Sequence, residues 1–369
     1  MVTRKQFILS AAALTGGMVA GEAYVFGKDK SSYEVAAREI RRPITGSAQN
    51  ASSIQSELVR HATLAASNHN IQPWKFQLSE KNISIFPDFT RRSPAVDPDD
   101  HHLFSSLGCA AENLIQASLA NSLMGTLHFS ENAANEIRVE LQPTRAIVSP
   151  LFKAIPQRQC TRAEFDGRPI SPEELKLLVL AGTGEGVGVQ ILTEQKSLEG
   201  ILEYVIAGNT AEMSNPACVA ELKTWMRFND REAARTGDGL FSRTTGNPSL
   251  PTWLGNIMFN TFYKTKSENE KYVRQIRSSA GIAVFVSEKN DKFHWVEAGR
   301  CYERFALQAT ALGIRNAMIN QPVEVSEVRT QLASYLGIGN SRPDLVVRFG
   351  RGPTMPQSLR RPVEAVLIS

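Results

Sequence analysis

Five hydrogen-bonding side chains and a proline lie within the eight residues from Ser67 to Trp74. Residues 54–65 before them carry apolar residues at the spacing of one helical face, and residues 75–78 after them alternate as in a half-buried strand. A helix that ends in such a loop exposes amide side chains and backbone N–H groups at a fixed edge. This edge would suit a flat heterocycle rich in carbonyls and ring nitrogens. An Asn-rich capping turn without a ligand is the equal alternative.

Two guanidinium groups form the second candidate site. Arg158 and Arg162 are separated by three residues, so they could clamp a dianion through charge-assisted bonds. An exposed basic turn is the alternative. Shortly afterwards, Ser171, Pro172 and Glu174 have the pattern of a helix start with a capping box.

The stretch from Ala65 to Phe76 resembles the A-P-S-x-x-N-x-Q-P-W-x-F segment of nitroreductase-like flavoproteins, and most of all their exported Acg-type branch. In that family this loop lies over FMN from the neighbouring half of a dimer. Ala66 stands where the family usually has Pro. The stretch from Arg158 to Arg162 is similar to the R-R-S-x-R element that holds the FMN phosphate, with Gln159 and Cys160 replacing the second Arg and the Ser.

Two later stretches extend the resemblance. Residues 311–321 are similar to A-x-G-L-x-x-x-P-I-E-G, which passes the reactive edge of the flavin, and the backbone N–H that bonds N5 falls at Asn320. Residues 358–364 resemble the closing R-x-P segment, in which Arg360 fits the phosphate ligand best and Arg361 is its rival. The resemblance therefore implies FMN contacts at Ala66, Ser67, Asn68, Asn70, Arg158, Gln159, Cys160, Arg162, Met318, Ile319, Asn320, Gln321, Arg360 and Arg361.

The chain also repeats itself in outline. Gly108 and Glu112 have the same spacing as Gly299 and Glu303, and each pair follows a strand-like run. The resemblance implies an α+β, nitroreductase-type fold that is duplicated within one chain as a pseudo-dimer, with long helices flanking the sheets. We expect the first half at 54–150 and the second at 151–369. Because the second half has a Gly-rich run at 181–188 in place of the Asn-rich loop, we expect one complete FMN site per chain.

The remaining segments are predicted from composition. Residues 28–53 are polar and predict a linker. Residues 208–265 contain many aromatic residues, and the part from 235 to 251 is rich in Gly, Thr, Asn and Pro, which favours a structureless lid over a simple linker. Residues 225–228 are expected to be helical.

Residues 1–27 resemble a twin-arginine export signal in which Arg4 and Lys5 form the basic pair. The following apolar run is short for a membrane-spanning helix, which needs ~20 residues. We expect an exported, periplasmic protein whose membrane contact is limited to this signal if it stays uncleaved. That location argues against soluble nicotinamide as the electron donor.

The composition is that of a globular chain, with 42% hydrophobic and 21% charged residues and a net charge of +4. We expect a monomer without a nucleic-acid partner. The four cysteines show no metal-binding spacing, and a disulfide between two of them stays open. His101 and His102 lie beside three aspartates, but we expect a solvated turn there and no metal.

The function that the resemblance implies is an FMN-dependent oxidoreductase. It would take electrons from an unknown donor and reduce a flat small molecule, such as a quinone or a nitroaromatic, by hydride transfer through flavin N5. The alternative is a protein that binds and stores FMN with little turnover. A weaker third possibility is a protein that keeps the scaffold without a flavin.

Overall fold

Two antiparallel sheets organise the computed structural model, which describes residues 32–44, 51–131 and 134–368. The first sheet has the order β11-β1-β2-β4-β3, in which β11 (Leu367–Ile368) is a parallel edge strand and the other four are antiparallel: Trp74–Leu78, Asn82–Pro87, Leu123–Ser130 and Glu136–Pro143 for β1 to β4. The second has the order β5-β8-β10-β9, with β5 at Val187–Leu192, β8 at Gly281–Ser287, β9 at Arg315–Met318 and β10 at Arg342–Gly350.

The two sheets share one connectivity. In each, the second strand leads into a long helix: α4 (His101–Ala120) joins β2 to β3, and α12 (Lys292–Ala311) joins β8 to β9. These neighbouring strands are all paired antiparallel in both sheets. The expected α+β fold that occurs twice within one chain is therefore confirmed.

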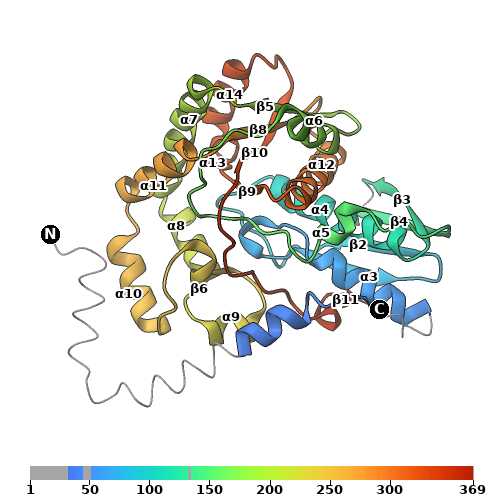
Figure 1. Cartoon of the computed structure of the whole chain (residues 1–369). Coiled ribbons are helices and arrows are strands. Elements are labelled where there is room, and N and C mark those ends of the chain that lie inside the picture. The colour runs from blue at the N-terminus through green and yellow to red at the C-terminus, as the bar shows by residue number, and fades with distance from the viewer. Residues whose placement is uncertain (1–31, 45–50, 132–133, 369) are drawn as a thin grey trace, which may run out of the picture.

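The helices α4 and α12 pack against each other between the sheets (Figure 1). A Cβ atom on Gly108 would lie 1.9 Å from the carbonyl oxygen of Val296, and one on Gly299 would lie 1.9 Å from that of Ser105. Gly108 thus faces the residue three positions before Gly299, and Gly299 faces the residue three positions before Gly108. The two glycines that the repeat pairs in the sequence therefore lie where the helix backbones come too close for a larger side chain.

The end of the chain returns to the first sheet. After β10 the chain runs back past α12, and β11 (Leu367–Ile368) pairs in parallel with β1, where Leu367 lies opposite Phe76 (Figure 1). In the other direction, Cys160 forms a parallel bridge with Asn316 at the edge of the second sheet. The chain end after the second sheet therefore pairs with the first sheet, and the chain that leaves the first sheet pairs with the second.

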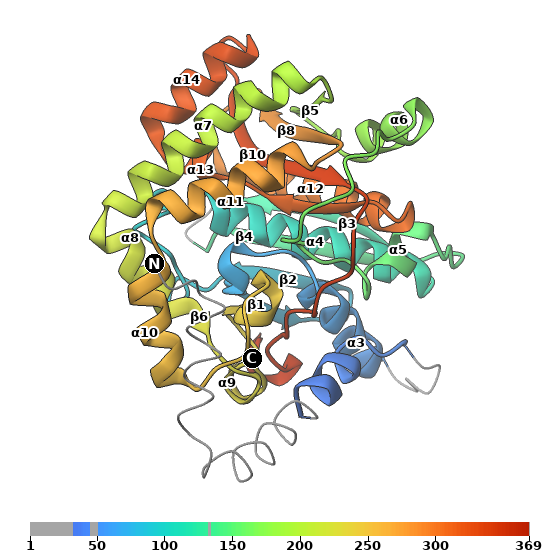
Figure 2. The ribbon, with the colours of Figure 1, turned by 60° about the vertical axis from the view of Figure 1, so that its left-hand side comes forward.

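The remaining helices cover the second sheet and the ends of the molecule. On the face turned away from α12 lie α7 (Gln195–Ser214), α11 (Thr265–Arg277) and α14 (Ser326–Leu336), which bury Ile201, Ile276 and Leu332 against β8 and β10 (Figure 2). The other helices are α3 (Ala51–Thr63), α5 (Pro150–Ala154), α6 (Pro172–Ala181), α8 (Pro216–Trp225), α9 (Asp230–Thr236), α10 (Thr252–Phe262) and α13 (Gln321–Glu324), with 3-10 turns η1 (Asn68–Asn70), η2 (Ser242–Thr245) and η3 (Val363–Ala365). As predicted, Ser171 opens α6 with a capping box to Glu174.

Two segments differ from the sequence prediction. The described part of the expected linker contains a helix over 32–39, because Tyr33 and Ala37 are buried beside Phe241; α3 then begins at Ala51, before the expected end of the linker. The segment 235–251 is not structureless, since it contains the end of α9, β7 (Leu240–Phe241) and η2. Residues 226–227 form the short strand β6 that pairs with β7, so the predicted helix ends at Trp225.

The N-terminal signal predicted at 1–27 lies outside the described residues. Among the helices that are described, none is long and apolar enough to cross a membrane.

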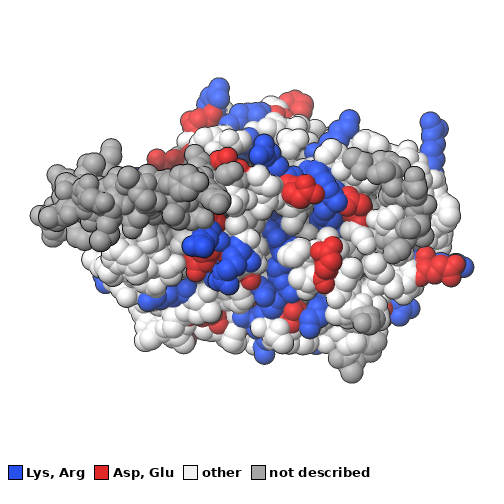
Figure 3. All heavy atoms as spheres, turned by 90° about the horizontal axis from the view of Figure 1, so that it is seen from below, with Lys and Arg blue, Asp and Glu red and all other residues white. Residues whose placement is uncertain are grey.

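All four cysteines are free thiols, so the possible disulfide is not present in the structure. On the face seen from below, Lys and Arg gather along the middle with Asp and Glu among them (Figure 3).

Candidate functional site

A cavity of about 280 Å³ lies between the two halves and the segment 208–265. This volume is near the lower end of small-molecule sites, which span roughly 300–1,000 Å³. Its wall contains most of the expected FMN contacts: Ala66, Ser67, Asn68, Asn70, Arg158, Gln159, Cys160, Arg162, Met318, Asn320, Gln321 and Arg360. Ile319 and Arg361 are not in the wall. The fold therefore brings the motif segments, which are far apart in the sequence, to one cavity.

The loop at residues 67–72 is held in an unusual backbone conformation. His69, Asn70 and Gln72 have φ angles of 45°, 55° and 58°, which cost non-glycine residues of order 1–3 kcal/mol each. Two distant segments impose this shape. The N–H of Gly239 donates to the Asn70 carbonyl (3.1 Å), Gln72 Nε2 donates to the Gly237 carbonyl (2.8 Å), and the Arg361 N–H donates to Gln72 Oε1 (2.9 Å).

Asn70 and Arg360 use their polar groups within the protein. The amide of Asn70 donates to the carbonyls of Gly239 and Leu359, and its oxygen accepts from Arg360 at 2.9 Å. Arg360 also donates to the carbonyls of Thr63, Leu64 and Ala65, at the C-terminal end of α3. This differs from the expectation that Asn70 bonds the flavin ring and Arg360 the phosphate, because both side chains are already satisfied by internal partners.

The two arginines of the predicted phosphate clamp have different surroundings. Arg158 is buried and forms an ion pair with Glu303, 2.9 Å from Nε to Oε1, and it donates to the Leu64 carbonyl at 2.8 Å. Arg162 lies in the cavity wall, and within the described residues its guanidinium has no recorded ion pair or hydrogen bond. Arg162 is therefore the clamp residue that is available to a ligand, while Arg158 is structural.

Met318, Asn320 and Gln321 line another part of the wall. The N–H of Ile319 donates to the Val346 carbonyl, and Asn320 Oδ1 accepts from the N–H of Val346, each at 2.9 Å. These bonds turn the Asn320 side chain toward β10. Gln321 donates to the hydroxyl of Tyr272 at 2.6 Å, and its Oε1 atom is buried without a partner.

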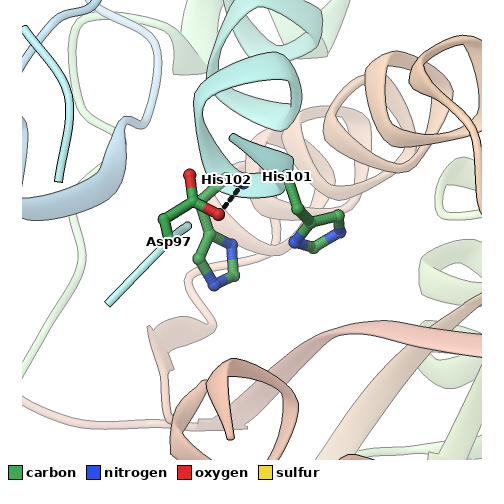
Figure 4. Close-up of side chains that lie close together, drawn as sticks. All are labelled: Asp97, His101 and His102. Atoms are coloured by element: carbon green, nitrogen blue, oxygen red, sulfur yellow. Dashed lines mark hydrogen bonds between the residues drawn. The ribbon is translucent and has the colours of Figure 1, made fainter. Parts of the chain in front are cut away.

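The histidine doublet is buried, so the expected solvated turn is wrong. Asp97, His101 and His102 place ligand-type atoms within 4.8 Å of one another at the start of α4 (Figure 4). Each group already has a partner in the fold. Asp97 accepts from the backbone N–H groups of His102 and Leu103, His101 bonds Asp344 at 3.0 Å, and His102 bonds Glu324 at 3.2 Å. The doublet thus ties the first half to β10 and α13 of the second.

Several polar residues of the cavity were not predicted from the sequence. Arg41 comes from the segment taken for a linker, and its Nε atom is buried without a partner. His69 lies within the opening loop, and its Nδ1 atom is likewise unpartnered. Glu212, Lys271 and Glu324 come from helices that face the sheets in their other parts. No local pattern marks them, because only the packing of α7, α11 and α13 turns them into one wall.

The search against known protein families found no match. In sequence, the chain is 23% identical over 318 residues to proteins from two strains of Mycobacterium tuberculosis, whose names contain the words NAD(P)H nitroreductase. The match covers 83% of this chain and 88% of each relative. This chain is similar to those two proteins over most of its length.

Solved structures include similar chains with low scores. A nitroreductase with bound FMN from Bacteroides fragilis is 17% identical, with a TM-score of 0.35 over 56% of this chain and 89% of its own. One from Desulfitobacterium hafniense, also with bound FMN, is 14% identical, with a TM-score of 0.38 over 58% of this chain and 96% of its own. An FMN-dependent nitroreductase from Mycobacterium smegmatis in complex with NADPH is 14% identical, with a TM-score of 0.36 over 55% and 87%.

Proposed function

We propose that this chain is an FMN-dependent oxidoreductase of nitroreductase type. It takes two electrons from a reduced donor and passes them to a flat small molecule, such as a quinone or a nitroaromatic. The observation that carries this proposal is the cavity at the junction of the two halves, whose wall contains residues 66–70, 158–160, Arg162, Met318, Asn320 and Gln321. The sequence similarity to the mycobacterial proteins supports the same activity.

The residues of the cavity fit FMN. Among the described residues the Arg162 guanidinium has no ion-pair or hydrogen-bond partner. Arg41 and Lys271, the latter paired with Glu268 at 3.4 Å, bring two further cationic side chains to the same wall. A phosphate dianion would satisfy these groups through charge-assisted hydrogen bonds. Buried polar atoms without partners, on His69 and Gln321, remain for the polar edge of the ring. Ala317, Met318 and Tyr263 supply apolar surface.

In the proposed mechanism the protein positions the ligands and excludes water. Bound FMN would accept and release a hydride at N5. The backbone at 318–321 forms one wall, and the loop at 67–70 forms the wall contributed by the first half. Gly237 and Gly239 hold that loop through their backbone groups, so we propose that the segment 208–265 acts as a lid over the site. A fixed, water-poor site of this kind favours direct hydride transfer.

The pairing of the halves supports a pseudo-dimer, in which each half completes what the other lacks.

We also propose that the protein is exported, as in the exported branch of the family, and that the N-terminal stretch is its twin-arginine signal. Fractionation of cells that produce the full chain tests this. A protein that stays in the periplasmic fraction when Arg4 and Lys5 are both replaced by Gln would contradict a twin-arginine route.

The central experiment measures flavin content and turnover of the purified chain. We expect a yellow protein whose flavin is reduced in vitro by NAD(P)H, the donor class in the relatives' names, which here replaces the unknown donor of an exported protein, and reoxidised by para-benzoquinone or a nitroaromatic. A flavin that binds tightly but is not reduced by NAD(P)H or dithionite would favour the alternative, an FMN-storing protein. A colourless chain that takes up no FMN would rule out both.

A further inference from the structure

Two carboxyl groups meet in the cavity wall. Glu212 on α7 and Glu324 at the end of α13 both line the cavity and are hydrogen-bonded to each other through their side chains. The Oε1 atom of Glu212 is buried, and no ordinary donor within the described residues reaches it. Two ionised carboxylates in contact repel each other, so a pair of this kind is stable when one member keeps a proton.

The third member of the group decides which carboxyl keeps the proton. His102 Nε2 lies 3.2 Å from Glu324 Oε1, and the two side chains are only 5% and 10% exposed. Burial, and then the charge of Glu324, raise the pKa of Glu212 well above its usual range. Burial alone would raise the pKa of Glu324, but its bond to His102 lowers it. Burial alone would lower the pKa of His102, but the bond to Glu324 and the charges of Asp97 and Glu324 raise that pKa above its usual value. Glu212 is therefore the neutral acid, beside an ionised Glu324–His102 pair.

The other titratable groups around Glu212 do not compete as acids near neutral pH. Burial raises the pKa of Cys218, Tyr263 and Tyr272. Lys271 is paired with Glu268 at 3.4 Å on the same helix. Burial lowers the pKa of His69 to about 4, so its ring is neutral.

We propose that Glu212 is the acid that gives a proton to the acceptor in the cavity, and that Glu324 and His102 are positioning residues that keep it protonated. The proposal rests on the proposed function. Reduction of a quinone to a quinol, or of a nitro group to a nitroso group and water, consumes one hydride and one proton for each two-electron step. The hydride carries both electrons, and the proton leaves the Glu212 carboxyl. The Glu212 carboxylate, left beside the ionised Glu324, then regains a proton from solvent.

The first test compares two glutamates of α7 in the full chain loaded with FMN. Glu212→Gln keeps the shape and a hydrogen-bond donor but removes the acid. We expect turnover with para-benzoquinone to fall on the order of 10²-fold, the lower range for loss of an acid–base group. FMN binding should stay unchanged. Glu203→Gln, at an exposed position of the same helix, should keep full turnover.

The pH profile separates an acid from a structural residue. In the wild type, turnover should fall at alkaline pH as Glu212 loses its proton, and this limb should be absent from Glu212→Gln. Glu324→Gln removes the neighbouring negative charge, so it should move the alkaline limb to lower pH while the chain remains folded. A Glu212→Gln variant with the turnover and pH profile of Glu203→Gln would overturn the role of Glu212 and leave the proposed function standing.

A second readout does not depend on turnover. The infrared band of a protonated carboxyl group should be present at neutral pH in the wild type and in Glu203→Gln, and it should be reduced in Glu212→Gln. An unchanged band would overturn the proposal at any turnover. If the wild type binds FMN but reduces no acceptor, the proposed function fails and the donor role of Glu212 fails with it, while the band still decides whether the protonated pair exists.

Discussion

Arg158 and Arg162 have the same charge and belong to one motif, but the fold gives them different tasks. Arg158 is buried with Glu303, whereas the Arg162 guanidinium lines the cavity and has no partner in the part of the chain that the structure describes. Breaking a buried ion pair leaves an uncompensated charge, which typically costs about 3–5 kcal/mol. Substitution of Arg158 should therefore affect mainly stability, whereas substitution of Arg162 should affect mainly ligand binding.

We expect Arg162→Ala to weaken FMN binding by ~1.5–3 kcal/mol, the worth of a charge-assisted bond, and to weaken riboflavin binding much less. The unfolding free energy should hardly change. Arg158→Ala should instead lower the unfolding free energy by several kcal/mol. Flavin titrations and urea unfolding of both variants check this. Equal losses of FMN and riboflavin affinity in Arg162→Ala would place the phosphate elsewhere, with Arg41 and Lys271 as the next candidates.

Asn70 bonds Gly239, Leu359 and Arg360 at once. Asn70→Ala removes these bonds and leaves buried partners unsatisfied, so we expect the unfolding free energy to fall by ~1–3 kcal/mol. FMN and riboflavin affinities should fall by one common factor, because only the ring end of the site is disturbed. Calorimetry and flavin titration measure the two effects. If flavin affinity falls with stability unchanged, the Asn70 amide contacts the ring directly.

His61 places a pH-sensitive group in the helix α3. Burial lowers its pKa to about 4, and the neutral ring bonds the Glu57 carbonyl at 3.0 Å. The unfolded chain binds a proton near pH 6.5 while the folded chain does not, so stability is lost as the pH falls from about 6.5 toward 4. The slope approaches about 1.4 kcal/mol per pH unit for one such group.

The matching experiment measures the unfolding free energy of the wild type and of His61→Gln between pH 7 and pH 5. We expect the wild type to lose stability on acidification more steeply than the variant. His69, whose pKa burial also lowers to about 4, remains in both proteins and contributes equally to both slopes. Identical slopes would show that His61 is solvated in the native state.

At the scale of elements, the crossing of α4 and α12 depends on two glycines. A methyl group on Gly108 would overlap the Val296 carbonyl, whose backbone cannot move without shifting α12. We expect Gly108→Ala to lower the unfolding free energy by about 1–3 kcal/mol or more. Gly188→Ala in β5 is the matched control, because nothing lies within 4 Å of its added Cβ. Equal midpoints in urea for both variants would contradict the close packing.

At the scale of the whole molecule, the two halves are alike in topology but not in their loops. The loop 66–72 borders the cavity, whereas the loop at 181–186, which precedes β5 as 66–72 precedes β1, lies against α12. Arg304 donates to the carbonyls of Ala181 and Thr183, and a Cβ on Gly184 would lie 2.2 Å from Glu297. The loop of the second half is thus packed against α12, and the cited contacts leave it facing a helix where the loop of the first half faces the cavity.

We therefore expect one FMN for each chain, bound by a monomer. The measurement is the flavin absorbance of the protein relative to its chain concentration, with the mass of the native complex as an independent check. Two FMN molecules bound per chain would contradict the inequivalence of the halves. A dimer in solution would contradict the idea that one chain replaces the usual pair of subunits.

The sequence by itself determined the features that depend on neighbouring residues. The capping box at Ser171, the strands and the two glycines of the repeat follow from local hydrogen bonding and spacing, and the motif loops marked most of the cavity wall. Only the tertiary structure decided which polar groups remain free for a ligand. Arg158, Arg360 and Asn70 find internal partners that are distant in the chain, and Glu212 and Glu324 meet through the packing of α7 on α13. The physical reason is that a buried polar group bonds whatever lies within about 3 Å of it, and long-range packing sets that neighbour.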